Sequence, residues 1–166
     1  MKSAGSRVDF EEELKNWLSG ATRVVIAGIG NEIRQDDFVG VKIVRDLQDK
    51  VPASVHLIEC ETVPESFMDE IIELKPSHVL LIDAAMLNME AGVVHLYEPC
   101  KIANIPAITT HMLPLRVFCE YVTELSKAKL ALLLVQPLNV DFGEGLSKEV
   151  AKSSGDIVEV LIKLLS

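Results

Sequence analysis

The chain has 166 residues, of which 49% are hydrophobic and 25% are charged. This length and composition fit one soluble globular domain, and no apolar run approaches the roughly 18 residues of a membrane-spanning helix. The formal net charge of −9 disfavours nucleic acid and anionic membranes as partners, because both would be repelled. We expect a single-domain monomer over residues 1–166.

The three cysteines predict free thiols rather than a disulfide framework. Cys60, Cys100 and Cys119 are odd in number, lie far apart and form no CxxC pair, which also excludes zinc-ribbon and thioredoxin-like motifs. The acidic, helix-patterned N-terminus lacks the apolar stretch of a secretory signal. A reducing cytoplasm is the expected location.

The first third of the chain predicts a helix, a strand and a second helix. An N-terminal extension, residues 1–22, contains a short amphipathic helix over residues 9–18. The run TRVVIAGIGN is apolar and β-branched and ends in glycines, which is typical of a buried strand. Asp36 and Asp37 then open a helix with a one-sided apolar pattern. That pattern comprises Gly40, Ile43, Val44 and Leu47.

The middle third predicts three strands and one helix. A second strand covers residues 55–59, and Pro64 begins a helix whose inner face carries Phe67, Ile71 and Leu74. The segment HVLLIDA is a third strand, apolar until Asp83. Residues 91–97 follow without an intervening helix, so we expect a fourth, antiparallel edge strand.

The last third predicts helix, strand and helix. The helix after His111 is expected to bury Phe118, Tyr121, Val122 and Leu125. A fifth strand, LALLLVQP, leads to a C-terminal helix that begins near Ser147. Its expected inner face comprises Val150, Ile157, Val158, Leu161 and Leu164. The alternation predicts an α/β three-layer sandwich with a twisted, mostly parallel five-stranded sheet between helices.

Polar side chains follow several of these strands, where functional groups of open α/β sheets gather. Asp37 follows the first strand, Asp83 ends the third, and His111 precedes the helix before the fifth. Simpler roles stay open: Asp36 or Asp37 as a helix N-cap, Asp83 at a solvated strand end, and His111 as a structural loop residue. A buried carboxylate is costly, however, and needs partners.

Other polar residues near this edge are weaker candidates. Glu59 and Glu61 flank Cys60 at the end of the second strand, and Asn31 is expected to direct its amide at the cleft. Gly28 and Gly30 form only half of a dinucleotide fingerprint, so they predict a tight turn rather than nucleotide binding. The remaining histidines lie in or beside strands. They are His56, His78 and His95.

Three segments together resemble the nickel-iron hydrogenase maturation endopeptidases: GIGNEIRQDDFVGVKIVRDL, HVLLIDA and TTHMLPL. The resemblance runs from about Arg23 to the C-terminus. TTHMLPL and LALLLVQP are most similar to the branch that processes the hydrogenase 3 large subunit, the formate hydrogenlyase type. Two departures are the ECETVPES segment, where the family often has a glycine pair, and the helical extension before Arg23.

The resemblance implies an endopeptidase that removes the C-terminal extension of the hydrogenase large-subunit precursor after nickel insertion. It places the metal-contacting and catalytic roles on Asp37, Asp83 and His111, with Asn31, Asp36 and Glu61 as possible supporting residues. Because the chain lacks HExxH, we expect nickel to arrive with the substrate; other divalent cations are possible substitutes. Either an aspartate or the metal could activate water.

Three other functions stay open at this point. GIGN alone would fit a nucleotide-binding α/β enzyme. The same acidic and imidazole groups would also serve a non-catalytic module that recognises a loaded metal centre. A third alternative is a metallopeptidase that carries its own zinc.

Overall fold

The fold is described from a computed structural model, which describes residues 7–98 and 112–166. The strands are β1 (Val24–Ile29), β2 (Val55–Glu61), β3 (His78–Ala84), β4 (Val94–Tyr97) and β5 (Lys129–Val135). The α-helices are α1 (Arg7–Trp17), α2 (Val39–Leu47), α3 (Met68–Glu73), α4 (Met112–Ser126) and α5 (Lys148–Leu165). Two 3₁₀ helices, η1 (Gln35–Phe38) and η2 (Pro64–Phe67), precede α2 and α3.

The five strands form one sheet in the order β2-β1-β3-β5-β4. β1 pairs in parallel with β2 and β3, and β3 pairs in parallel with β5. β4 pairs antiparallel with β5 at the sheet margin. The predicted α/β sandwich with an antiparallel fourth strand is therefore confirmed.

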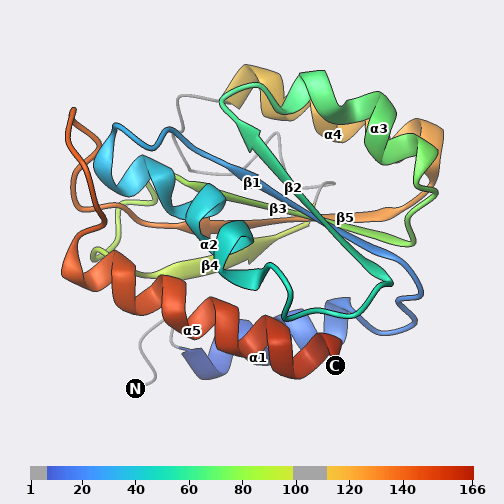
Figure 1. Cartoon of the computed structure of the whole chain (residues 1–166), viewed down its shortest axis with the longest axis horizontal. Coiled ribbons are helices and arrows are strands. Elements are labelled where there is room, and N and C mark those ends of the chain that lie inside the picture. Colours follow the sequence, from blue (N-terminus) through green and yellow to red (C-terminus); the bar gives the residue numbers. More distant parts are fainter. Residues whose placement is uncertain (1–6, 99–111) are drawn as a thin grey trace.

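Helices cover both faces of the sheet (Figure 1). One core layer packs α1, α2 and α5 against the strands, and the other packs α3 and α4 against the opposite face. Alternate strand residues divide between these layers: Ile26 and Leu80 enter the first, and Ala27 and Leu81 enter the second. This period of two is what a strand buried on both faces requires.

The N-terminal helix α1 is part of the first core layer. Phe10, Leu14 and Trp17 are buried there. Trp17 also makes an edge-to-face contact with His78 of β3, with ring centroids 5.0 Å apart. The helix predicted before the first strand thus packs directly against the sheet.

The prediction for α4 is half right. Phe118 and Val122 are fully buried, but Tyr121 and Leu125 are 41% and 53% exposed. The buried stripe of α4 follows Leu115, Phe118, Cys119 and Val122, and Tyr121 lies off this stripe. Leu125 belongs to the last turn before the helix ends at Ser126, beyond this stripe.

Glycines set how closely α2 approaches the sheet. A Cβ on Gly40 would lie 2.1 Å from the Ile82 carbonyl oxygen and 2.4 Å from that of Ile29. A Cβ on Gly28 would lie 2.2 Å from the Gly40 carbonyl oxygen. Gly28 therefore serves close packing rather than the turn predicted for it, because its φ is not in the left-handed region. This contact seats the start of α2 on the ends of β1 and β3.

Within residues 7–98 and 112–166, no helix has the length and apolar character that crossing a bilayer would require.

Candidate active site at the carboxyl edge of the sheet

Asp83 is buried at the end of the central strand β3. Its side chain is 1% exposed, and its Oδ1 accepts a hydrogen bond from the Ala84 backbone N–H at 2.8 Å. By strand alternation it follows Val79 and Leu81 onto the face covered by α3 and α4. The solvated strand end considered for Asp83 is therefore wrong. Burial of a carboxylate costs several kcal/mol, which marks this position as one with a specific role.

Asp37 is held beside the end of the neighbouring strand β1. It lies in η1 and is 6% exposed, and its Oδ2 accepts the Asn31 backbone N–H at 3.0 Å. A Cβ on Gly30 would lie 2.1 Å from the Asp37 carbonyl oxygen, so the GIGN turn and η1 pack without space between them. The glycine at position 30 is thus required by the approach of η1.

The fold brings Asp37 and Asp83 to the same edge. β1 and β3 are adjacent parallel strands, with Gly28 paired to Ile82, the residue before Asp83. Gly40, three residues after Asp37, packs on the Ile82 carbonyl. The two carboxylates thus come from one edge of the sheet although 46 positions separate them in the sequence.

His111 lies outside the described residues. Among residues 7–98 and 112–166, no three His, Cys, Asp or Glu side chains group closely enough to hold a metal ion. The predicted trio contains His111, so that trio stays a prediction. α4 begins at Met112, directly after this histidine.

Asp36 has a structural role. It is fully buried, and its carboxylate accepts the backbone N–H groups of Leu138, Asn139 and Ser147, at 2.9, 3.2 and 2.7 Å. The Ser147 hydroxyl donates a fourth hydrogen bond, at 2.9 Å. All four donors belong to the connection from β5 to α5. Neither Asp36 nor Asp37 makes a side-chain cap on η1 or α2, so the N-cap alternative is wrong.

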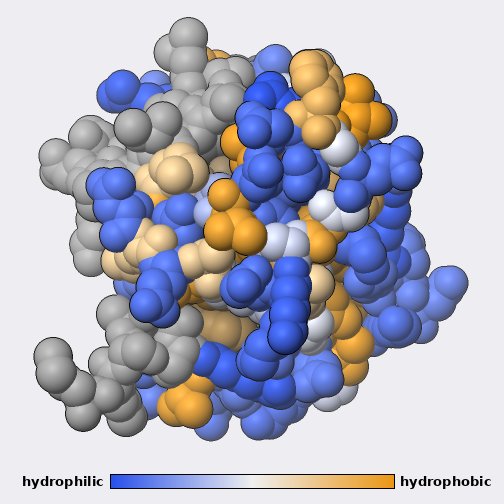
Figure 2. Space-filling model, turned by 90° about the vertical axis from the view of Figure 1, so that its left-hand side faces the viewer, coloured by the Kyte–Doolittle hydropathy of each residue, from blue (hydrophilic) through white to orange (hydrophobic). Residues whose placement is uncertain are grey.

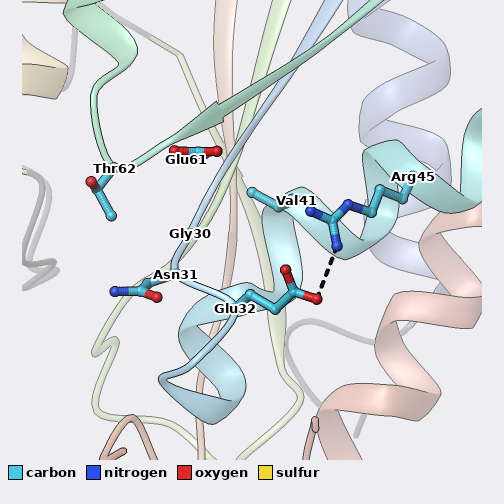
Figure 3. Close-up of a pocket in the computed structure, with 7 residues that line it drawn as sticks. All are labelled: Gly30, Asn31, Glu32, Val41, Arg45, Glu61 and Thr62. Carbon is cyan, nitrogen blue, oxygen red and sulfur yellow. Dashed lines mark ion pairs between the residues drawn. The ribbon is translucent and has the colours of Figure 1, made fainter. Parts of the chain in front are cut away.

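Asn31 and Glu61 line a pocket between the turn after β1, the end of β2 and α2 (Figure 3). The pocket has a volume of about 270 Å³. Its lining comprises Gly30, Asn31, Glu32, Val41, Arg45, Glu61 and Thr62. The Asn31 Oδ1 accepts the Ile33 backbone N–H at 3.1 Å, so the amide oxygen is used to close the turn.

A bulge in β2 shapes the wall of this pocket. The pairing with β1 skips Cys60, so Gly28 pairs with Glu59 and Ile29 with Glu61. Glu61 has a φ of 50°, in the left-handed region that favours glycine, and its carbonyl oxygen accepts the Gly30 N–H at 2.8 Å. This glutamate belongs to the ECETVPES segment, which departs from the pattern of the resembling family.

Arg45 supplies the positive charge of the pocket. Its guanidinium pairs with Glu32 at 3.2 Å and with Glu59 at 3.0 Å, and it lies over the Phe38 ring at 5.2 Å. The hydrogen bonds to Glu59 and Glu32 raise the pKa of Arg45. Glu59 is therefore an ion-pair partner of α2 rather than a group at the two aspartates.

The sequence reasoning missed Arg45, Val41 and Thr62 as pocket residues. Val41 and Arg45 are four residues apart on α2 and so share one helix face. This spacing was the available signal, because α2 is the first α-helix after the GIGN turn. The position of Thr62 depends on the β2 bulge, which has no local sequence signal here.

The described cysteines do not suit nucleophilic catalysis. Cys119 is free and buried, as predicted, and Cys60 is free and buried as well; burial raises the pKa of each thiol to about 12. Both are protonated near neutral pH, whereas a cysteine nucleophile needs its thiolate. Cys100 lies outside the described residues. The chemistry available at the described part of the edge is therefore that of carboxylates.

Known proteins match both the sequence and this fold. A family model described as hydrogenase maturation protease matches residues 41–164. A Methanocaldococcus jannaschii protein assigned to the hydrogenase maturation proteases is 34% identical over 164 residues, covering 94% of this chain and 96% of its own length. The hydrogenase 3 maturation protease of Escherichia coli is 26% identical over 118 residues, covering 71% of this chain and 75% of its own.

The crystal structure of the nickel-iron hydrogenase maturation protease HycI from Thermococcus kodakarensis superposes with a TM-score of 0.84 at 30% identity. The superposition covers 92% of this chain and 98% of that one. Sequence and fold agree over nearly the same span. The chain belongs to the hydrogenase maturation protease family and is a peptide hydrolase.

Proposed function

We propose that this protein removes the C-terminal extension from the nickel-loaded large-subunit precursor of a nickel-iron hydrogenase. The observation that carries the proposal is the burial of two carboxylates, Asp37 and Asp83, at the ends of adjacent strands. They stand where the resemblance places metal-contacting groups. Carboxylate and imidazole are both established ligands of divalent metals.

The substrate brings the nickel in this scheme. Asp37, Asp83 and His111 complete the coordination of that ion, and the scissile peptide bond is thereby positioned for hydrolysis. A precursor without nickel offers these side chains nothing to bind, so it is spared. Other divalent cations of similar size can substitute at the same ligands.

Peptide hydrolysis needs an activated water, a polarised carbonyl and a proton for the leaving amine. In our scheme the nickel of the substrate polarises the scissile carbonyl, and a carboxylate of the protein accepts the proton of the water that attacks the carbonyl carbon. The same carboxylate then gives this proton to the nitrogen of the amine that leaves as the C–N bond breaks. The Asn31 N–H fixes one oxygen of Asp37. Asp37 therefore presents its other oxygen in a defined direction, as a general base requires.

The carboxyl edge of the sheet does not favour the binding of a nucleotide. A phosphate at a helix start is stabilised by free N–H groups and by the helix dipole. Here Asp36 and Asp37 occupy the first turn of η1, and both are buried. Their negative charge would repel a phosphate.

The test is mass spectrometry of the precursor after incubation with this protein, with and without nickel. We expect the wild-type protein to shorten only the nickel-loaded precursor. Asp37→Asn and Asp83→Asn should each slow the cleavage by more than about a hundredfold, because each removes a charged group from the reaction centre. The exposed Asp49, which follows the end of α2 at the opposite edge of the sheet, provides the matched control, and Asp49→Asn should cleave at the wild-type rate.

Two results would contradict the proposal. Cleavage of the precursor without nickel would remove the role of the metal in recognition. Wild-type rates in both Asp37→Asn and Asp83→Asn would remove the proposed roles of these carboxylates.

We further propose that the substrate is of the hydrogenase 3 type and that the protein works as a cytoplasmic monomer. The Escherichia coli relative is named for hydrogenase 3, which supports the first assignment. Two buried free thiols support a reducing compartment. Incubation with precursors of different hydrogenase types would test the first assignment, and sedimentation would test the monomer.

A further inference from the structure

Large apolar side chains stand exposed on two segments at the carboxyl edge. Ile33, in the turn after β1, is 53% exposed; Leu138 and Phe142, in the connection between β5 and α5, are 63% and 79% exposed. We call residues 136–147 the β5–α5 loop; it lies on the left-hand side of Figure 1, in orange to red. Figure 2 views this side and shows hydrophobic patches among hydrophilic residues.

Backbone hydrogen bonds join the two segments firmly. The Gly143 N–H donates to the Ile33 carbonyl at 2.9 Å, and the Gln35 N–H donates to the Gly143 carbonyl at 3.0 Å. The Asp36 N–H donates to the Asn139 carbonyl at 3.1 Å. The loop thus pairs with the turn after β1 over several residues.

Side chains add further links between the turn and the loop. The Arg34 Nε donates to the Val140 carbonyl at 3.0 Å, and the Arg34 guanidinium lies 5.7 Å from the centre of the Phe142 ring. The Asp36 carboxylate accepts four hydrogen bonds from the loop, two of them from Ser147. Phe142 and Leu138 are therefore held in place without being buried.

A rigid loop that exposes apolar side chains has the properties of a preformed docking surface. Single exposed apolar residues are ordinary, but neighbouring ones on a fixed backbone offer contact area with little entropy left to lose on binding. Aromatic side chains are the commonest anchors of such interfaces. Ile33, Leu138 and Phe142 together form what we call the apolar rim.

The charges beside the apolar rim indicate what it binds. Asp141 and Glu144 are exposed on the same loop, whereas the charge of Glu32, beside Ile33, is paired with Arg45 at 3.2 Å. The nearby cation Arg34 is engaged with Val140 and Phe142. The chain as a whole carries a net charge of −9. A complementary partner surface is apolar and bordered by lysine or arginine.

We infer that the apolar rim docks the folded body of the protein substrate while its C-terminal tail enters the edge beside Asp37 and Asp83. This inference rests on the proposed function. Asp36 joins the two regions, because it anchors the loop and directly precedes Asp37. Docking on the rim therefore fixes the substrate relative to the reacting groups.

The test compares steady-state processing of the full nickel-loaded precursor by the wild-type protein, Phe142→Ser, Leu138→Ser and the double variant. The matched control is Leu125→Ser, because Leu125 is 53% exposed but lies at the end of α4. Docking predicts a rise in KM of about tenfold or more for the double variant with little change in kcat. Leu125→Ser should keep the wild-type KM.

Two outcomes would overturn the inference. One is an unchanged KM in the double variant while the wild-type protein processes the precursor. The other is a wild-type protein that is a dimer and a double variant that is a monomer with an unchanged KM. That result would make the rim a contact between two copies of the protein. Failure of the wild-type protein to process any precursor would instead overturn the proposed function on which the inference rests.

Discussion

The two edges of the parallel strands treat polar groups in opposite ways. The buried carboxylates among the described residues, Asp36, Asp37 and Asp83, all lie at the carboxyl edge. At the amino edge, the Ser77 hydroxyl oxygen accepts the Thr22 and Arg23 backbone N–H groups, at 2.9 and 3.1 Å. One edge buries carboxylates at a cost, and the other closes with hydrogen bonds of ordinary length between side chains and backbone.

The difference places the candidate functional groups at one edge of the sheet, although both edges contribute to stability. Closure of the amino edge also involves the Arg23 guanidinium, which donates to the Leu74 carbonyl at 2.8 Å. These contacts hold the ends of β1 and β3 together. The carboxyl edge has buried carboxylates, a glutamate with a left-handed backbone conformation (Glu61) and the exposed apolar rim. Each of these features costs free energy, and such features are retained where a ligand or substrate uses them.

The largest effect on stability is expected where α2 meets the carboxyl edge. Gly40→Ala should lower the free energy of unfolding by about 3 kcal/mol or more, because the new Cβ would meet two backbone oxygens. The control is Gly155→Ala, since Gly155 lies in α5 with nothing within 4 Å of a Cβ. That change should stabilise the helix by about 0.5 to 1 kcal/mol. Urea unfolding measures the free energy of unfolding of both variants. Equal changes in Gly40→Ala and Gly155→Ala would contradict the close packing proposed at Gly40.

A smaller loss is expected from Asp36→Ala, by about 2 kcal/mol. The substitution leaves three partly buried N–H donors of the β5–α5 loop without their acceptor. The exposed Asp141 lies on the same loop, and Asp141→Ala should change stability by less than about 0.5 kcal/mol. Thermal unfolding of both variants would check this, and an unaffected Asp36→Ala protein would contradict the anchoring role.

Glu61→Gly should stabilise the protein by about 1 kcal/mol, because glycine adopts the left-handed φ of 50° without strain. Thr62→Gly is the matched change one residue later, outside the left-handed region, and should destabilise. Denaturant titration distinguishes the two. A loss of stability in Glu61→Gly would show that the glutamate side chain stabilises the bulge.

The smallest expected effect on stability comes from the protonation of His78 at the amino edge. Burial lowers the pKa of His78 below its usual 6.5; Lys129 lowers it further, against an opposing hydrogen bond to the Trp17 backbone. Below pH 6.5 the unfolded chain therefore binds this proton more readily than the folded one. The contribution of His78 to stability is complete above pH 6.5 and is lost as the pH falls.

The measurement is the free energy of unfolding of the wild-type protein and of His78→Phe from pH 7.5 to pH 5. The decline below pH 6.5 should be shallower in the variant. Parallel curves would mean that other groups cause the acid sensitivity of the fold.

The sequence predicted those parts of the candidate site in which an acidic residue follows a predicted strand. Asp83 follows an apolar run in HVLLIDA, and Asp37 follows the GIGN turn, so both were assigned to one edge from sequence alone. The family resemblance assigned the metal-contacting role to Asp37 rather than Asp36, but the structural role of Asp36 was not predictable. The partners of Asp36 lie about a hundred positions away, at Leu138, Asn139 and Ser147.

The amino-acid sequence by itself determined the strands, the helices and the antiparallel fourth strand, because burial on two faces or one imposes periods that a local pattern records. Only the tertiary structure decided that Tyr121 is exposed, that Gly28 serves close packing, and that the β5–α5 loop holds Phe142 in solvent. Each of these depends on contacts between segments far apart in the chain. Local periodicity carries no record of such contacts, and they arise only when the sheet and its connections pack together.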